Sequence, residues 1–310
     1  MATTEARPRA RVIIGRIGDP QAGVRQPQPI ILPDGATAFS RTAERLLALA
    51  DGHVMADWLR FMARVALAQQ AAMVAMPPTA VPTIEPAATE PAPPLAASAH
   101  RRDAAWRTAL ATLLDGTESP ALPEQATQVV ARLRGTEAPA LEGLADDYLG
   151  GRLAETQHGA ALYITASLQV YFTRLASTLP VHALRLLPQR GLCPVCGSAP
   201  VTGVVTATGH APGARYLHCR LCAAAWNHVR AVCINCGASG RLALHEIEGG
   251  TGAVKAETCD ACRGYAKMLY QANDMQVDPT ADDLASLGLD LLVSEAGWSR
   301  RAPNPLILTG

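Results

Sequence analysis

The sequence predicts an α+β protein with an N-terminal all-helical domain, two tandem metal-knuckle units and a C-terminal helix. Three observations predict this class. The 310-residue chain is 49% hydrophobic but only 4% aromatic, and its alanine- and leucine-rich segments favour helix. All eight cysteines lie between residues 193 and 262. They also fall into two stretches of identical cysteine spacing, which places a domain boundary near residue 188.

The segment up to residue 188 has helical periodicity. Apolar residues recur at three- and four-residue spacing, for example at Trp58, Leu59 and Met62, and Trp58 and Trp106 are expected in the core. Residues 77–94 contain seven prolines, which predicts an extended loop or linker. Helices are expected over 38–50, 53–76, 102–115, 123–134, 141–149 and 156–179. Residues 1–188 are therefore predicted to form one helical domain.

The C-terminal part, residues 279–310, is predicted to be an amphipathic helix followed by an extended tail. Thr280 is the expected N-cap, and Asp282 and Asp283 would lie in the first turn, where the helix dipole favours negative charge. We interpret this acidic pair, like Asp146–Asp147, as helix-end or surface charge. The expected apolar stripe comprises Leu284, Leu287, Leu291 and Leu292.

The cysteine region is an internal duplication. Residues 191–230 and 231–270 both read C-x2-C-G-x21-C-x2-C, and a fixed period of this length marks repeated structural units. The sequence therefore predicts two units, 189–230 and 231–278. The stretch 223–232 would be a hinge between the two copies, and Trp226 would pack them together.

Two cysteines separated by two residues can face one metal ion from a tight turn, and a glycine after the second cysteine permits that turn. Two such turns at the ends of a small antiparallel sheet form a zinc-ribbon or rubredoxin-like site with four thiolates. A cross-brace between the first and third pairs is an alternative, but the duplication favours one complete site per unit. The predicted metal ligands are Cys193, Cys196, Cys219 and Cys222 in the first unit and Cys233, Cys236, Cys259 and Cys262 in the second.

The spacing leaves the metal open between iron and zinc, because both accept four thiolates in a tetrahedron. Disulfides and a thioredoxin-type redox motif fit this pattern less well. Four histidines lie nearby but exceed the coordination number, and we expect them to be exposed or outside the ligand set. They are His210, His218, His228 and His245.

Composition and motifs argue against several functions. The formal net charge is zero, and residues 191–270 hold seven Lys or Arg against four acids, so nucleic-acid binding is not indicated. No phosphate loop, nucleophile elbow or metalloprotease helix is present, so we expect no enzyme. The N-terminus lacks a signal-peptide pattern, and 156–180 is interpreted as a buried helix without a membrane span. A cytoplasmic protein is expected.

With these residues in hand, the chain resembles the formate dehydrogenase accessory protein FdhE family. The resemblance rests on GLCPVCGSAP, YLHCRLCAAAWNHVRAVCINCG, ETCDACRGYAKML and the closing ADDLASLGLDLL and NPLIL, and covers nearly the whole chain except residues 77–94. It implies a cytoplasmic maturation factor that binds the formate dehydrogenase catalytic subunit before export. It also implies that all eight cysteines bind iron in two rubredoxin-like sites. A stand-alone electron carrier and a zinc-ribbon interaction module are the alternatives.

Overall fold

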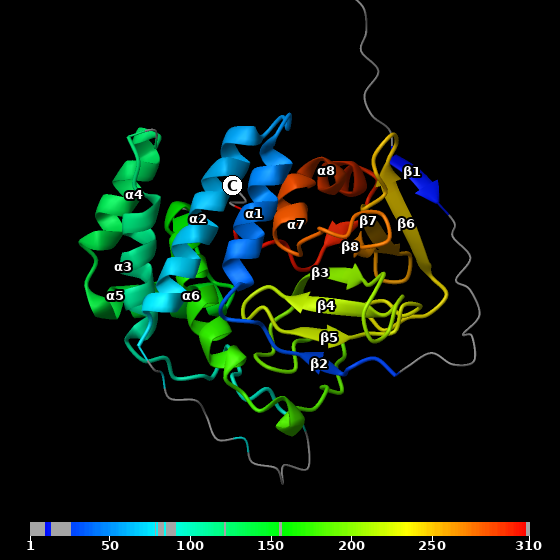
Figure 1. Cartoon of the computed structure of the whole chain (residues 1–310), viewed down its shortest axis with the longest axis horizontal. Helices are drawn as coiled ribbons and strands as arrows, with labels where there is room; N and C mark the ends of the chain where they lie inside the picture. Colours follow the sequence, from blue (N-terminus) through cyan, green and yellow to red (C-terminus); the bar gives the residue numbers. More distant parts are fainter. Residues whose placement is uncertain are drawn as a thin grey trace, which may run out of the picture.

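The N-terminal helices gather on one side of the molecule, and the strands and the two short C-terminal helices lie on the other (Figure 1). The computed structural model describes residues 10–13, 26–77, 79, 84, 91–120, 122–154 and 157–307. One hydrophobic core runs through both sides, because it joins helical residues such as Leu59 and Phe172 to strand residues such as Leu217 and Met268. This architecture confirms the predicted α+β fold class.

The helical side confirms the predicted segments. Helix α6 lies at its centre and is buried around almost its whole circumference, since helices cover one side of it and the cysteine region covers the other. Trp106 is completely buried as predicted, whereas Trp58 is only partly buried and packs beside the Phe61 ring. The bounds are α1 Ala38–Ala50, α2 Ala56–Ala75, α3 Ala105–Thr117, α4 Glu124–Arg134, α5 Ala138–Leu149, α6 His158–Ser177 and a short 3-10 helix, η2, Val181–Ala183.

Two three-stranded antiparallel meanders form the strand side. The first unit contributes β3 Pro200–Val205, β4 Arg215–Cys219 and β5 Ala225–Asn227, and the second contributes β6 Leu242–Ile247, β7 Val254–Cys259 and β8 Gly264–Tyr270. Shifted by forty residues, the strands of the first unit overlap those of the second. The duplication seen in the cysteines is therefore a duplication of the whole strand unit.

The two units join edge to edge into one sheet, in which β8 pairs with β3 in parallel. Gly203 lies opposite Met268 at this joint, and a Cβ at Gly203 would come within 2.7 Å of the Met268 sulfur. Short strands from distant parts of the chain complete the sheet. They are β1 Ala10–Ile13 on β6, β2 Ile30–Ile31 on β5, and β9 Ser299–Arg300 on β8.

This joint corrects the predicted hinge at 223–232, because part of that stretch is β5 of the first unit. Trp226 is completely buried there, and its indole nitrogen donates a hydrogen bond to the Arg190 carbonyl oxygen at 2.8 Å. Because Arg190 belongs to the same unit, this bond fixes β5 within the first unit and does not join the two copies. The units are tied to each other by the β3–β8 pairing and by an ion pair between Arg215 and Glu257 at 2.7 Å.

The C-terminal segment also differs from the predicted single helix. It forms α7 (Ala281–Ala285) and α8 (Leu287–Glu295), which are separated by the non-helical backbone of Ser286. Thr280 makes no capping hydrogen bond; the Asp278 carboxylate accepts the Thr280 and Ala281 backbone N–H groups instead. Because the segment bends at Ser286, the predicted stripe breaks up, and Leu291 is 67% exposed.

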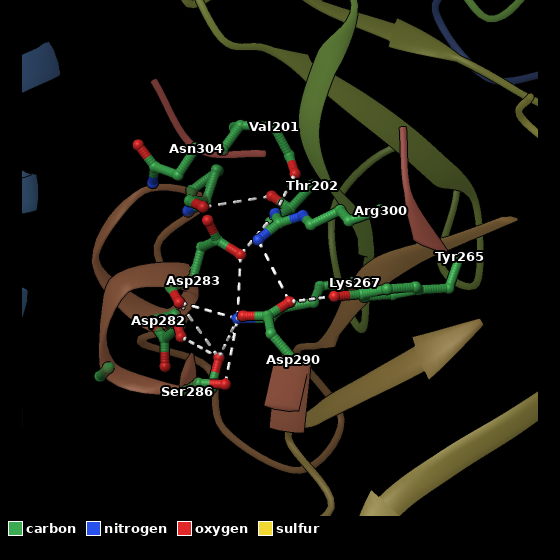
Figure 2. A network of polar contacts seen from close by, with 12 residues as sticks. Val201, Thr202, Tyr265, Lys267, Asp282, Asp283, Ser286, Asp290, Arg300 and Asn304 are labelled. Atoms are coloured by element: carbon green, nitrogen blue, oxygen red, sulfur yellow. Dashed lines mark hydrogen bonds and ion pairs between the residues drawn. The ribbon is translucent and has the colours of Figure 1, made fainter. Parts of the chain in front are cut away.

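The acidic pair lies in the first turn of a helix, α7, as predicted, but both side chains are buried and are not surface charges. Asp282 binds the Arg45 guanidinium of α1, with a shortest distance of 2.7 Å. Asp283 is completely buried and pairs with Lys267 of β8 at 3.2 Å and with Arg300 of β9 at 2.6 Å. Figure 2 shows how Asp290 of α8 closes this network, at 2.5 Å from the Lys267 ammonium.

The network fastens α7, α8 and β9 to the sheet. Lys267 also donates hydrogen bonds to the Asp283 and Ser286 carbonyl oxygens and to the Ser286 hydroxyl. The Asp283 and Ser286 carbonyl oxygens also accept backbone N–H groups, from Ser286 and Leu289. The buried lysine therefore adds bonds to the backbone at the point where the predicted helix divides.

Candidate metal centres

The eight cysteine sulfurs gather into two clusters of four. In cluster one, defined as Cys193, Cys196, Cys219 and Cys222, the sulfurs all lie within 4.8 Å of one another. The same holds in cluster two, defined as Cys233, Cys236, Cys259 and Cys262. The structure thus brings together the sets expected from sequential pairing, with one cluster in each unit, and not the cross-braced sets.

Within each cluster the sulfurs contact across the two turns. Cys193 Sγ lies 3.6 Å from Cys222 Sγ, and Cys196 Sγ lies 3.3 Å from Cys219 Sγ. In cluster two the corresponding distances are both 3.8 Å. Four soft sulfur donors at these separations suit the tetrahedral coordination of zinc or iron. Both clusters could therefore bind a metal ion.

All four Cys-x-x-Cys turns place the residue after the second cysteine in the left-handed backbone region. Gly197 and Gly237 have φ of 75° and 74°, as the glycines predicted. Ala223 and Arg263 occupy the same position in the later turns with φ of 55° and 54°. A non-glycine residue adopts this conformation at a cost, so the turn geometry is retained even without glycine.

Cluster one is enclosed by the helical side of the protein. None of its four cysteines is more than 5% exposed. The backbone N–H groups of Leu95 and Ala97 donate to the carbonyl oxygens of Val195 and Cys196, both at 2.9 Å. From α6, the Gln169 side chain donates to the Arg220 carbonyl oxygen at 2.8 Å. Both turns of the cluster are therefore held by segments outside the unit.

Cluster two is open to solvent on one side. Cys233 and Cys259 are buried, but Cys262 is only partly buried and Cys236 is exposed. A cavity of about 280 Å³ lies beside it, and both Cys236 and Cys262 line this cavity. The duplicated sequence pattern contains no sign of this difference, because the residues that cover cluster one, Leu95, Ala97 and Gln169, come from outside the repeated units.

Burial has a direct effect on the thiols of cluster one. It raises the pKa of Cys193 and Cys222 well above the ordinary thiol value. At Cys196 burial acts in the same direction, but hydrogen bonds from the other three thiols outweigh it and lower the pKa. A bound cation would stabilise four neighbouring thiolates against this cost of burial.

The nearby histidines belong to neither cluster. His228 and His245 are buried, so they lie outside the ligand set without being exposed. His228 Nδ1 lies 2.7 Å from an Arg215 guanidinium nitrogen, and His245 Nε2 lies 2.9 Å from the Thr258 hydroxyl. In these contacts His228 and His245 act as buried side chains that form hydrogen bonds.

Comparison with known proteins places the chain. Family models for FdhE match in three consecutive parts: the N-terminal domain over residues 27–188, the central domain over 192–230 and the C-terminal domain over 231–307. The chain belongs to the FdhE family. A curated FdhE homologue of Edwardsiella ictaluri is 40% identical over 285 residues, which cover 91% of this chain and 92% of the relative. Protein FdhE of Escherichia coli K12 is 35% identical over the same shares.

A solved FdhE structure shows the same fold. The crystal structure of the FdhE protein from Pseudomonas aeruginosa matches with a TM-score of 0.80 and 35% identity, covering 91% of this chain and 100% of that chain. In the part of this FdhE-family chain that the structure describes, no helix is long and apolar enough to cross a membrane. The family and the two thiol clusters together are the basis for a functional proposal.

Proposed function

We propose that this chain is an accessory protein of formate dehydrogenase maturation that binds the catalytic subunit and carries one metal ion in each four-cysteine cluster. Membership of the FdhE family supports the accessory role. The observation that carries the metal proposal is the convergence of the four cysteine pairs into two sets of four sulfurs, with the sulfurs of each set within 4.8 Å of one another. As the resemblance implies, this step would take place in the cytoplasm before export of the client.

The eight cysteines would be the metal ligands, and they would fill the coordination of each ion. Such closed sites contribute folding free energy and leave no open position for a substrate, which supports a role other than catalysis. We propose iron as the metal. Iron in four thiolates changes between ferrous and ferric states, so it would allow electron exchange that zinc does not support.

We propose that the chain divides at residues 188, 230 and 278 into the helical domain, the two four-cysteine units and the C-terminal segment. The helices and the outer face of the strand units would together form the surface that docks the client. The fold supports one rigid docking body, because β2 from the N-terminal segment and β9 from the C-terminal segment both pair with the strand units. A client could therefore contact helices and cysteine units at once.

Three measurements test the proposal. Metal analysis of anaerobically purified protein should find two ions per chain, with the visible absorption of iron–thiolate bonds. An affinity-tagged chain should co-purify with the formate dehydrogenase catalytic subunit, and cells that lack the chain should lose client activity. Equal client activity with and without the chain would overturn the accessory role, and metal-free protein with intact folding would overturn the metal sites.

A further inference from the structure

The two clusters differ most in what lies beside them. Cluster one is covered by residues 93–97 and by α6, whereas cluster two forms part of the wall of the 280 Å³ cavity. This cavity lies between the two units: Gly191 and Pro200 belong to the first side, and Asn235 and Tyr265 to the second. Cys236 and Cys262 stand on the second side, so the sulfurs of an otherwise closed site are reachable from this space.

The glycine at position 264 lets the groups that line the cavity lie close to cluster two. Gly264 follows the last Cys-x-x-Cys turn, and a Cβ added there would lie 2.8 Å from Asn235 Nδ2, 3.3 Å from Cys262 Sγ and 3.4 Å from Arg301 Cγ. Any side chain at this position would push these groups apart. Because Gly264 has no side chain, the Asn235 amide and the Arg301 side chain can both lie close to the Cys262 sulfur of cluster two.

The cavity wall contains one cationic side chain. Among the described residues that line the cavity, Arg301 is the only cation, and the Cys236 and Cys262 thiolates would carry negative charge when they bind a metal. Within the described part of the chain its guanidinium has no carboxylate partner, and the residue is exposed. Its neighbour Arg300, by contrast, is fixed by the buried carboxylates of Asp283 and Asp290 and by the β9–β8 pairing. The buried network therefore fixes the backbone next to Arg301, so that this arginine is held at the wall of the cavity.

We propose that cluster two is an exchange site, at which small anions with carboxylate or thiolate donors enter the cavity beside Arg301 and reach the metal, while cluster one releases its metal at least tenfold more slowly. This proposal rests on the metal occupancy proposed above. The exchange step moves no electrons. The entering donor forms a bond to the metal, the bond to the exposed Cys236 sulfur breaks, and the released thiolate takes a proton from solvent.

Physical reasons favour Cys236 as the departing ligand. A sulfur in contact with water can be protonated and solvated as it leaves, whereas the sulfurs of cluster one would have to leave into a packed interior. An unpaired guanidinium raises the local concentration of anions and so speeds their encounter with the site. The charge therefore predicts a preference for anionic over neutral donors.

The test measures metal release from the purified holoprotein to excess EDTA, which is anionic, and to 1,10-phenanthroline, which is neutral. Metal that stays with the protein is quantified over time after rapid desalting. We expect two phases of equal amplitude, one fast and one at least tenfold slower. Alkylation with N-ethylmaleimide after the fast phase, followed by peptide mass spectrometry, should modify the four cysteines of cluster two and spare those of cluster one.

Two variants with matched controls test the route. Arg301→Gln should slow the fast phase with EDTA by about fivefold, an effect of the size expected for lost electrostatic steering, and leave the rate with 1,10-phenanthroline unchanged. Arg60→Gln removes an exposed arginine on α2 and should change neither rate. Ala302→Phe should fill the cavity and slow both chelators, whereas Ala296→Phe, at an exposed position outside the cavity lining, should not.

The outcomes separate this proposal from the one on which it rests. A purified chain with fewer than two metal ions would overturn the proposed occupancy. With two ions bound, equal release rates for both clusters, or alkylation of cluster one first, would overturn the exchange proposal alone. If Arg301→Gln slowed release to both chelators equally, the charge would have no part in recognition and the anion preference would be wrong.

Discussion

The replacement of Lys267 by methionine gives a sharp test of the buried network. The Lys267 side chain is completely buried and pairs with Asp283 and Asp290, while Arg300 supplies the second cation. Methionine keeps the length of the side chain but removes one positive charge, so two carboxylates would share a single cation. Removal of one partner from a buried ion pair typically costs about 3–5 kcal/mol, because the remaining charge lacks compensation.

The expected effect is a fall in the midpoint of thermal unfolding on the order of 10 °C, from that free energy and the usual relation between stability and midpoint for domains of this size. Circular dichroism measures the midpoint, and hydrogen exchange should show lost protection in α7 and α8. Arg60→Ala is the matched control, since its ion pair with Asp57 is solvent-exposed and contributes at most about 0.5 kcal/mol. Equal midpoints for the two variants would refute the reasoning.

The same variant has a predictable pH dependence. Burial by itself would raise the pKa of Asp283, but the charges of Lys267 and Arg300 outweigh it and hold the pKa below its ordinary value. Such a carboxyl contributes stability above its unfolded-state pKa of about 3.9 and loses it as the pH falls through the lower folded value. The stability difference between wild type and Lys267→Met should therefore be largest near neutral pH and shrink below about pH 4.

Three further predictions concern the cysteine units. Gly237→Ala should lower the free energy of unfolding by about 1 kcal/mol, because Gly237 has a left-handed φ of 74°, although the space around the new methyl group is open. Gly143→Ala inside α5 should raise the free energy of unfolding by roughly the same amount. Urea unfolding of both variants measures the two changes. Burial, with help from the Arg215 charge, lowers the pKa of His228 from 6.5 to about 4, so the stability of wild type relative to His228→Gln should fall as the pH drops through this interval. Equal urea midpoint differences at pH 7 and pH 4.5 would contradict that linkage. Removal of both metals should abolish hydrogen-exchange protection in the strands β3 to β8 while α2 and α6 stay protected, because the metals supply on the order of 10 kcal/mol of folding free energy to the two units. Unchanged protection of the strands would show that the two units fold without metal.

Features set by local spacing were predictable from the sequence. The repeated cysteine pattern predicted both clusters and their sequential grouping, because a four-cysteine unit must be complete within one copy of the repeat. The helices were predictable for the same kind of reason, since apolar periodicity over ten or more residues has one simple structural meaning. Trp58 shows the limit, because the same pattern did not distinguish a partly exposed edge from the buried Trp106.

Features set by distant contacts were not predictable. Asp282 and Asp283 lie in a sequence context typical of the first turn of an exposed helix. Their partners are 237 residues away at Arg45 and on two different strands at Lys267 and Arg300. A buried carboxylate of this kind differs from an exposed one only through its environment. The one sign in the sequence is weak: Lys267 is the only charged residue of the strand GYAKMLY, which suggests that a buried carboxylate pairs with it.

The difference between the clusters is the clearest case of this limit and bears directly on function. Duplication alone would produce two equivalent metal sites, and the cysteine spacing is indeed identical. The fold makes them unequal because Leu95, Ala97 and Gln169 bind the turns of cluster one, whereas Cys236 of cluster two is exposed beside the cavity that Arg301 lines. An enclosed site stabilises the fold against which the client would dock, while an open site can exchange with its surroundings. The two copies of the unit are thus suited to different tasks, and the metal-release experiment distinguishes them in a single preparation.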